Sequence, residues 1–167
     1  MIDPEEFLKF IKARRSIRSF QNKAISEKEI EMILEAGRWT PSASNLQPWE
    51  FIVIKNKEIL EKISKFAYYG QFIKDAPIAI AIVGKIKINP IWYKIDSTLV
   101  SMNMTLMAWA LRIGTCWLGD MNREKIKRII GLDENDHLLT VLPFGYIKGE
   151  VPVPMPRKPL NKIVKFV

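Results

Sequence analysis

The spacing of hydrophobic and polar residues along the chain predicts a protein built from both helices and strands. Five segments have the periodicity or the length of helices: residues 4–13, 27–37, 59–63, 95–111 and 123–130. Short apolar runs predict strands at residues 51–54, 78–83, 115–118 and 138–146, the last one broken by Pro143. Because helices and strands alternate without regular βαβ units, we expect one α+β domain over residues 1–167, with a mixed or antiparallel sheet flanked by helices.

Residues that start and stop helices support this assignment. Ser26 and Glu29 have the spacing of a capping box in front of the second helix. Gly131 is placed to end the last helix. From Gly149 onward the chain is rich in proline, so we expect it to be extended rather than globular.

The segment 95–111 is apolar on nearly all sides, so a helix there must be covered over most of its surface. The longest uncharged run, residues 97–111, is shorter than the roughly 20 residues needed to cross a bilayer and contains Ser, Thr and Asn. We therefore expect no membrane association, and a dimer interface would cover the helix. The first ten residues carry three acidic side chains instead of a secretory signal, which leads us to expect a cytoplasmic protein.

The net charge of +8 raises the alternative of a nucleic-acid-binding protein. The lysines, however, are scattered through the predicted helices, and no helix-turn-helix or zinc pattern is present. The regular interleaving of aromatic and basic residues seen in single-strand binders is also missing. We interpret the basic residues as solvated side chains on the protein surface and expect no nucleic acid partner.

The only cysteine and the only histidine do not form a plausible metal site or catalytic pair. One residue of each type cannot supply the four ligands of a structural zinc, so we expect no metal. Cys116 lies in an apolar strand and His137 in the acidic turn 133–136. We interpret them as a buried thiol and a surface imidazole rather than as a nucleophile and its base.

The five residues from Arg14 to Arg18 gather three guanidinium groups and a hydroxyl immediately after the first helix. Arginine presents a planar fork of donors that matches phosphate oxygens. Taken alone, this segment fits a solvated basic helix end, favoured by the helix dipole, as well as it fits a phosphate site. The pair Arg157 and Lys158, near the other end of the chain, favours the phosphate site.

Two further segments could help to build a ligand site. Residues 41–49 gather small hydroxyl and amide side chains between two prolines, although an ordinary loop with side-chain-stabilised turns has the same composition. Residues 114–119 begin and end with glycine but lack the lysine and hydroxyl residue that complete a phosphate-binding P-loop. A tight turn explains this segment equally well.

In their order and spacing, the segments 14–18, 41–49, 114–119 and 156–159 resemble the FMN-dependent nitroreductase family. The resemblance runs over about residues 7–167. It implies a homodimeric α+β sandwich in which the C-terminal extension reaches the partner subunit, with two flavins at the dimer interface.

The resemblance also implies which residues hold FMN. Those expected at the phosphate are Arg14, Ser16, Arg157 and Lys158. Arg18 matches a basic residue that faces the pyrimidine edge, where a positive charge would stabilise the reduced flavin. Arg15 matches less securely and is free to point to solvent.

The other two segments would surround the flavin rings. From the partner subunit, the contacts expected are Pro41, Ser42 and Ala43, with Asn45 and Gln47 as polar contacts nearby. A backbone N–H of Leu118 or Gly119 would approach flavin N5. Because the flavin would carry the redox step, we expect no catalytic acid or base in the protein.

The implied activity is that of an NAD(P)H oxidoreductase. NADH or NADPH would give a hydride to flavin N5, and a nitroaromatic or quinone-like acceptor would then use the same open face, giving ping-pong kinetics. Relatives of this fold also reduce free flavin, dehalogenate or desaturate rings, and these reactions stay open as alternatives. The short segments 67–77 and 85–93 leave little chain for a substrate lid, which favours an open and unselective site.

Overall fold

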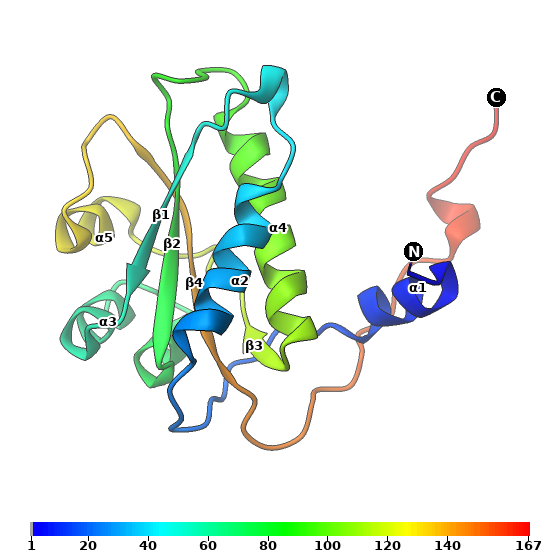
Figure 1. The fold of residues 1–167 in the computed structure, drawn as a ribbon, viewed down its shortest axis with the longest axis horizontal. Coiled ribbons are helices and arrows are strands. Elements are labelled where there is room, and N and C mark those ends of the chain that lie inside the picture. Colours follow the sequence, from blue (N-terminus) through cyan, green and yellow to red (C-terminus); the bar gives the residue numbers. More distant parts are fainter. Residues whose placement is uncertain (1) are drawn as a thin grey trace.

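A four-stranded antiparallel sheet organises the fold (Figure 1). The computed structural model describes residues 2–167. Within them the strands are β1 (Trp49–Ile54), β2 (Ile78–Gly84), β3 (Ile113–Thr115) and β4 (His137–Tyr146). Their spatial order is β1-β2-β4-β3, and each neighbouring pair is antiparallel. The predicted α+β class with an antiparallel sheet is thus confirmed.

Helices cover both faces of this sheet. Helices α2 (Glu27–Arg38) and α4 (Tyr93–Ala110) lie on one face, and α3 (Lys57–Ser64) and α5 (Arg123–Ile130) lie on the other (Figure 1).

The side chains of β2 alternate between the two resulting cores. Ile78, Ile80 and Ile82 belong to the core under α2 and α4, whereas Ala79 and Ala81 belong to the core under α3 and α5. This is the alternation that a strand imposes, because successive side chains point to opposite faces. The small alanines leave room for the bulky side chains that the second pair of helices contributes.

The predicted helix ends are confirmed. The backbone N–H of Ser26 donates to Glu29 Oε2 at 2.9 Å, and the N–H of Glu29 donates to Ser26 Oγ at 3.3 Å, which completes a capping box. Glu29 Oε1 also accepts a hydrogen bond of 2.7 Å from the Tyr146 hydroxyl, which ties the start of α2 to the end of β4. Gly131 ends α5 with a φ of 67°, a left-handed conformation that suits glycine.

Two strand predictions are wrong in detail. Strand β3 covers Ile113–Thr115 rather than residues 115–118, because the chain leaves the sheet there and Leu118 packs into the core under α3 and α5. Strand β4 is not broken at Pro143, which pairs with Ala79 of β2. Since β3 pairs only with residues 144–146, Pro143 has one strand neighbour, and its missing N–H is tolerated.

Helix α4 is buried along the side that faces the sheet and exposed along another. Val100, Met104 and Ala108 are buried in the core, whereas Leu99 and Met102 are exposed. No helix within residues 2–167 combines the length and the apolar character that a bilayer crossing requires.

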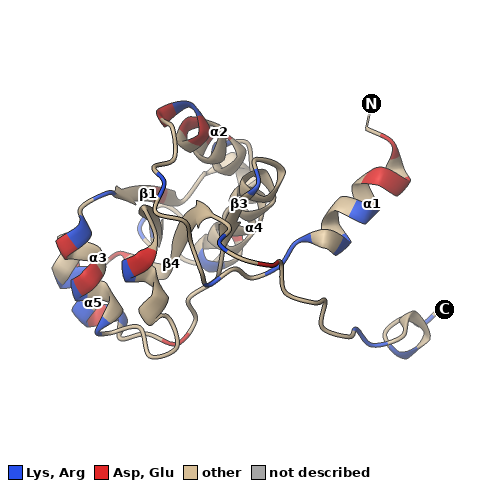
Figure 2. Ribbon diagram, turned by 90° about the horizontal axis from the view of Figure 1, so that it is seen from below, with Lys and Arg blue, Asp and Glu red and all other residues tan. Residues whose placement is uncertain are grey.

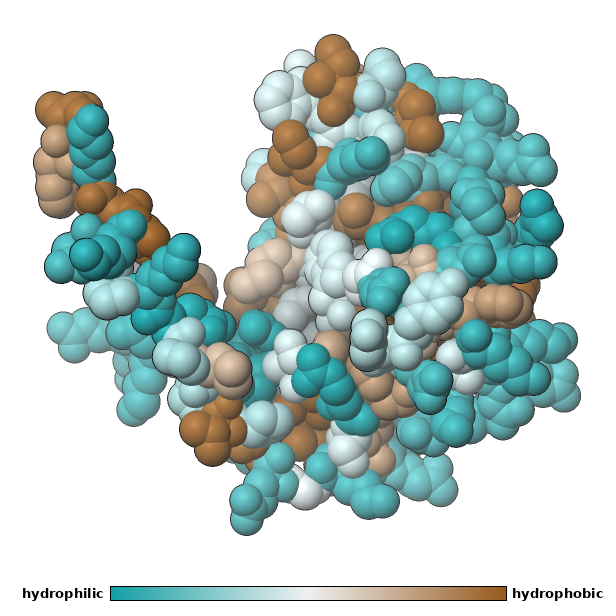
Figure 3. Space-filling model, turned by 180° about the vertical axis from the view of Figure 1, so that it is seen from behind, coloured by the Kyte–Doolittle hydropathy of each residue, from teal (hydrophilic) through white to brown (hydrophobic). Residues whose placement is uncertain are grey.

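Helix α1 (Pro4–Ala13) and the C-terminal tail, residues 149–167, project from the same side of the molecule (Figure 1). The tail is extended except for one 3₁₀ turn at Leu160–Lys162, as predicted. None of the residues of α1 is buried. Both segments expose large hydrophobic side chains: Phe7, Leu8, Ile11, Val153, Met155, Leu160, Ile163 and Phe166. Figure 3 shows hydrophobic surface, in brown, on the projecting arm. Exposed hydrophobic side chains gathered on two neighbouring segments mark an interaction site.

Candidate functional site

The arginine-rich segment between α1 and α2 is attached to the edge of the sheet. Ser16 forms a parallel bridge with Thr115 of β3, and the backbone N–H of Ile17 donates to the Thr115 carbonyl at 2.9 Å. Close contact requires glycine in the neighbouring strand, since a Cβ on Gly114 would lie 2.6 Å from the Ile17 side chain. The segments 14–18 and 114–119, distant in sequence, therefore form one structural unit.

Cys116 lies directly beneath this segment. Its thiol donates to the Trp117 carbonyl at 3.8 Å, and burial raises the pKa of the thiol although Arg18 and Arg14 act in the opposite direction. A thiol with a raised pKa is a poor nucleophile at neutral pH, which agrees with the interpretation of Cys116 as a buried structural thiol.

Arg14 and Arg157 meet although 142 positions separate them along the chain. Burial, followed by the neighbouring charges of Arg15 and Arg157, lowers the pKa of the Arg14 guanidinium. Both residues line a cavity of about 740 Å³ between the end of α1, the tail and α4. Figure 2 shows the basic segment that joins α1 to the body, close to the point where the tail leaves it.

This group of cations has no acidic partner. Within residues 2–167, Arg14, Arg15, Arg18 and Arg157 take part in no ion pair. Positive charges that lie close together without a counter-ion repel one another, and the half-buried Arg14 is also poorly solvated. Binding of an anion would relieve both effects. A phosphate dianion would satisfy both the charge and the donors.

Arg15 does not point freely into solvent, so that expectation is wrong. It is half-buried, and its Nη1 donates to the carbonyls of Lys12 at 2.6 Å and Arg14 at 2.8 Å, at the end of α1. Its Nε donates to the Pro152 carbonyl at 3.1 Å. Arg15 thus binds the tail to the end of α1 and keeps Arg157 near Arg14, whereas Lys158 is exposed on the tail.

The segment 41–49 lies elsewhere in the subunit, beside the N-terminal half of α4. It is the cyan loop at the top of Figure 1, whereas β3 and the arginine segment lie near the opposite end of α4. The backbone N–H of Ala43 lies 3.4 Å from both carboxylate oxygens of Asp96, a buried residue in the first turn of α4. One subunit therefore does not bring this loop to the arginines.

The same loop has a strained backbone. Ser44, Asn45 and Gln47 have φ angles of 53°, 55° and 49°. These angles lie in the left-handed region of the backbone, which residues other than glycine and asparagine rarely occupy. The Gln47 N–H donates to Ser42 Oγ at 2.9 Å, and Gln47 Nε2 donates to the Asn45 carbonyl at 3.1 Å. Strain held by local hydrogen bonds, with Pro41 and Asn45 exposed, is typical of a binding loop.

The segment after β3 offers two free backbone donors. Leu118 is buried, and its carbonyl accepts a hydrogen bond of 2.9 Å from Thr140 Oγ1. The Gly119 carbonyl accepts from Arg123 Nη2 at 3.1 Å. Among residues 2–167, neither the Leu118 N–H nor the Gly119 N–H donates to a protein acceptor. This is the arrangement needed for a backbone donor that meets a ligand.

Two exposed aromatic residues, Tyr68 and Tyr69, lie beside these donors and were not expected from the sequence. The Tyr68 N–H donates to the Asp120 carbonyl at 3.1 Å, which places Tyr68 and Tyr69 next to residues 118–120. The sequence shows only a short segment there, because the neighbours of these tyrosines are set by a contact between residues 52 positions apart. His137 is half-buried edge-on against Tyr93, with ring centroids 5.4 Å apart, so the prediction of a surface imidazole is wrong. Burial lowers the pKa of its imidazole.

Comparison with known proteins identifies the family of this chain. The model of the nitroreductase family matches residues 11–146. A protein of Archaeoglobus fulgidus, provisionally named NADH dehydrogenase/NAD(P)H nitroreductase, is 38% identical over 153 residues, which cover 87% of this chain and 88% of that protein. Iodotyrosine deiodinase of Hydra vulgaris is 28% identical over 201 residues, covering 96% of this chain and 73% of the relative.

A solved structure has the same fold over nearly the whole chain. It is a provisionally assigned nitroreductase of Desulfovibrio desulfuricans in complex with FMN, and it superposes with a TM-score of 0.88 at 26% identity. The superposition covers 98% of this chain and 96% of the other.

Proposed function

Because this chain belongs to the nitroreductase family of oxidoreductases, we propose that it is an FMN-dependent NAD(P)H oxidoreductase that reduces nitroaromatic or quinone-like acceptors. The observation that carries the proposal is that Arg14 and Arg157 line one cavity and, within residues 2–167, form no ion pair with an acidic residue. When bound, FMN supplies the redox chemistry by accepting a hydride at N5 and passing the electrons on.

The residues present fit an FMN phosphate at one end of the site. Arg14 and Arg157 supply charge and forked donors, Ser16 supplies a hydroxyl, and Arg15 orders the tail that carries Arg157. Arg18 extends the positive charge beyond the phosphate, where it would stabilise a reduced and anionic ring edge. Lys158, adjacent in the tail, adds a further cation.

The free N–H groups of Leu118 and Gly119 suit the ring end of the cofactor. They lie in the unit that also holds the arginine segment, so both ends of the cofactor would be held by one rigid edge of the sheet. Tyr68 and Tyr69 stand beside them and would form an aromatic wall for a flat donor or acceptor. Electron-poor aromatic acceptors suit such a wall.

The remaining contacts would come from a second subunit. The loop 41–47 is too far along α4 to join the arginines of its own chain, and its strained, partly exposed backbone is ready to contact a ligand. The exposed apolar surfaces of α1, α4 and the tail support a homodimer. We expect light scattering to give twice the mass of 19.4 kDa.

A second candidate reaction is reductive dehalogenation, favoured by the similarity to iodotyrosine deiodinase over 96% of this chain. Both reactions would use the same flavin and differ in the acceptor. A panel of nitroaromatics, quinones, free flavin and halogenated phenols, tested under one set of steady-state conditions, separates them.

The first test is a visible absorption spectrum of the purified protein, repeated without oxygen after adding NADH and then NADPH. We expect a flavin spectrum that bleaches with one of the donors and returns when a nitroaromatic or quinone is added. A colourless protein that takes up no FMN would refute the proposal. If neither NADH nor NADPH bleaches the flavin, the assignment of FMN as cofactor stands and the assignment of NAD(P)H as donor is refuted.

A further inference from the structure

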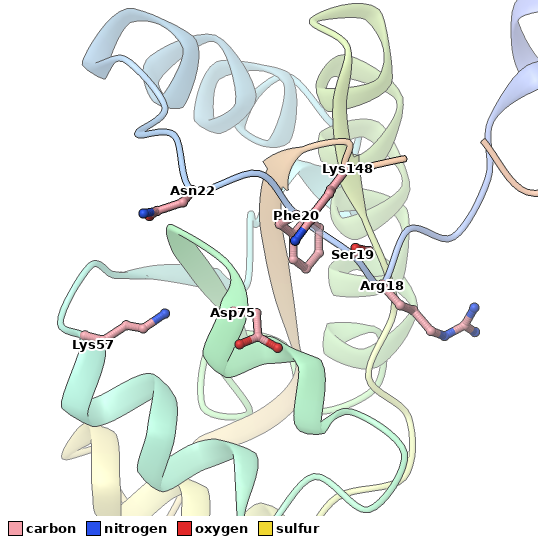
Figure 4. Close-up of a pocket in the computed structure, with 7 residues that line it drawn as sticks. All are labelled: Arg18, Ser19, Phe20, Asn22, Lys57, Asp75 and Lys148. Atoms are coloured by element: carbon pink, nitrogen blue, oxygen red, sulfur yellow. The ribbon is translucent and has the colours of Figure 1, made fainter. Parts of the chain in front are cut away.

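A second cavity, of about 320 Å³, lies beside Arg18 (Figure 4). Residues from four distant parts of the chain line it: the segment 18–22, the start of α3, the 3₁₀ turn Gln71–Asp75, and Lys148 after β4. The expected FMN contacts use only one of these residues, Arg18. The cavity is therefore a separate place that adjoins the proposed flavin site.

The walls of this cavity are rigid. Phe20 forms an antiparallel bridge with Ile147 and is buried, and the backbone N–H of Lys148 donates to the Ser19 carbonyl at 3.1 Å. On the opposite wall, the Lys57 ammonium group donates to the backbone carbonyl of Lys74. These contacts hold the Lys148 backbone and the Lys57 ammonium group in place before any ligand arrives.

Three cations and one carboxylate line this cavity, which gives it a net charge of about +2, and Figure 4 shows the Arg18 guanidinium directed away from the other side chains. Within residues 2–167, Arg18, Lys57, Lys148 and Asp75 form no ion pair with one another or with any other residue. Figure 4 shows the Asp75 carboxylate turned into the cavity and the ammonium groups of both lysines directed toward its interior. An excess of unpaired cations favours an anionic ligand.

The carboxylate narrows the choice of anion. Asp75 would repel a bare phosphate ion but would accept hydrogen bonds from hydroxyl groups beside a phosphate. The Asn22 side chain adds both a donor and an acceptor. A ribose phosphate carries both kinds of group, and the cavity volume lies at the lower end of the range for small-molecule sites.

We propose that this cavity binds the phosphate-bearing ribose end of the pyridine dinucleotide that donates the hydride. This inference rests on the proposed function, since Arg18 would link the dinucleotide to the ring edge of the flavin. It gives Lys57, Asp75 and Lys148 a role in donor binding that requires none of them to touch the flavin.

The test is isothermal titration of the FMN-loaded protein at low salt with three probes: ADP, 2′,5′-ADP and inorganic phosphate. The variants are Lys57→Gln and Lys148→Gln, and the matched control is Lys62→Gln, which removes the same charge from an exposed position on α3 outside the cavity. We expect each cavity variant to weaken binding of both nucleotides about tenfold, the size of one charge-assisted contact, with FMN content unchanged. We expect the control to bind like the wild type.

A third variant tests the role of the carboxylate. Asp75→Ala should strengthen binding of inorganic phosphate and weaken binding of ADP, because it removes a repulsive charge and a hydroxyl acceptor at once. Equal changes for the two probes would overturn the ribose assignment.

Three results would overturn the proposal: no nucleotide binding, cavity variants that match Lys62→Gln, or inorganic phosphate that binds as tightly as ADP, which would make this a free-phosphate site. Because binding is read as heat, it is independent of flavin reduction. A flavin that neither NADH nor NADPH bleaches would therefore refute the proposed function by a separate measurement.

Discussion

Replacement of Arg14 by alanine tests the proposed phosphate site most directly. Arg14 is half-buried and lies next to Arg15 and Arg157, so its guanidinium is already held where an anion would bind. A hydrogen bond to a charged group contributes about 1.5–3 kcal/mol. Arg14→Ala should therefore weaken FMN binding by about tenfold to a hundredfold.

The same variant should affect the apoprotein differently. Burial and the two neighbouring arginines lower the pKa of the Arg14 guanidinium, so the folded apoprotein holds this charge less favourably than water does. Removing the charge should leave the Tm of the apoprotein unchanged or raise it. The FMN-induced rise in Tm should shrink by about 3–6 °C for each tenfold loss of affinity in a domain of 167 residues.

The assay is fluorescence titration of FMN into apoprotein, together with thermal unfolding with and without FMN. Arg128→Ala is the control, because Arg128 is exposed on α5 and forms no ion pair within residues 2–167. A Kd for Arg14→Ala within about twofold of the control would refute the phosphate assignment. An equal fall in Tm with and without FMN would show damage to the fold instead of a lost ligand contact.

Three further predictions concern the elements that position the site. Asp96→Ala leaves the N–H of half-buried Ala43 without its acceptor, so we expect a loss of about 1–3 kcal/mol in urea unfolding and a smaller loss for Asp96→Asn, which keeps an oxygen. Gly114→Ala should cost about 1–3 kcal/mol through its 2.6 Å contact with the arginine segment and should also reduce FMN content. Hydrogen bonds from Ser26 lower the pKa of Glu29 in the folded state, so the stability due to Glu29 is present above pH 4.5 and is lost as pH falls through the lowered value. Glu29→Gln should therefore be less stable than the wild type at pH 7, and the difference should close below pH 4.5.

Much of the fold was predictable because its signals are local. The capping box at Ser26 and the glycine after α5 act within one turn of a helix, and the apolar run 78–83 needs no partner to be recognised as a strand. The errors occur where a distant segment decides the outcome. Pro143 is compatible with a strand only because β3 ends beside it, and Leu118 leaves the sheet because a core on the other face receives it.

The chemical groups of the proposed site can be read from the amino-acid sequence: the arginines of residues 14–18, the small polar side chains of residues 41–49, the glycines at 114 and 119, and the cations of the tail. Tertiary structure decided how these parts meet. It joined Ser16 to Thr115, brought Arg157 to Arg14, turned Arg15 into the anchor of the tail, and kept loop 41–47 away from all of them within one subunit. It also assembled the cationic cavity around Asp75 from four segments with no shared motif. The physical reason is that periodicity and capping act over a few residues, whereas a binding site depends on contacts between residues that are far apart in the chain.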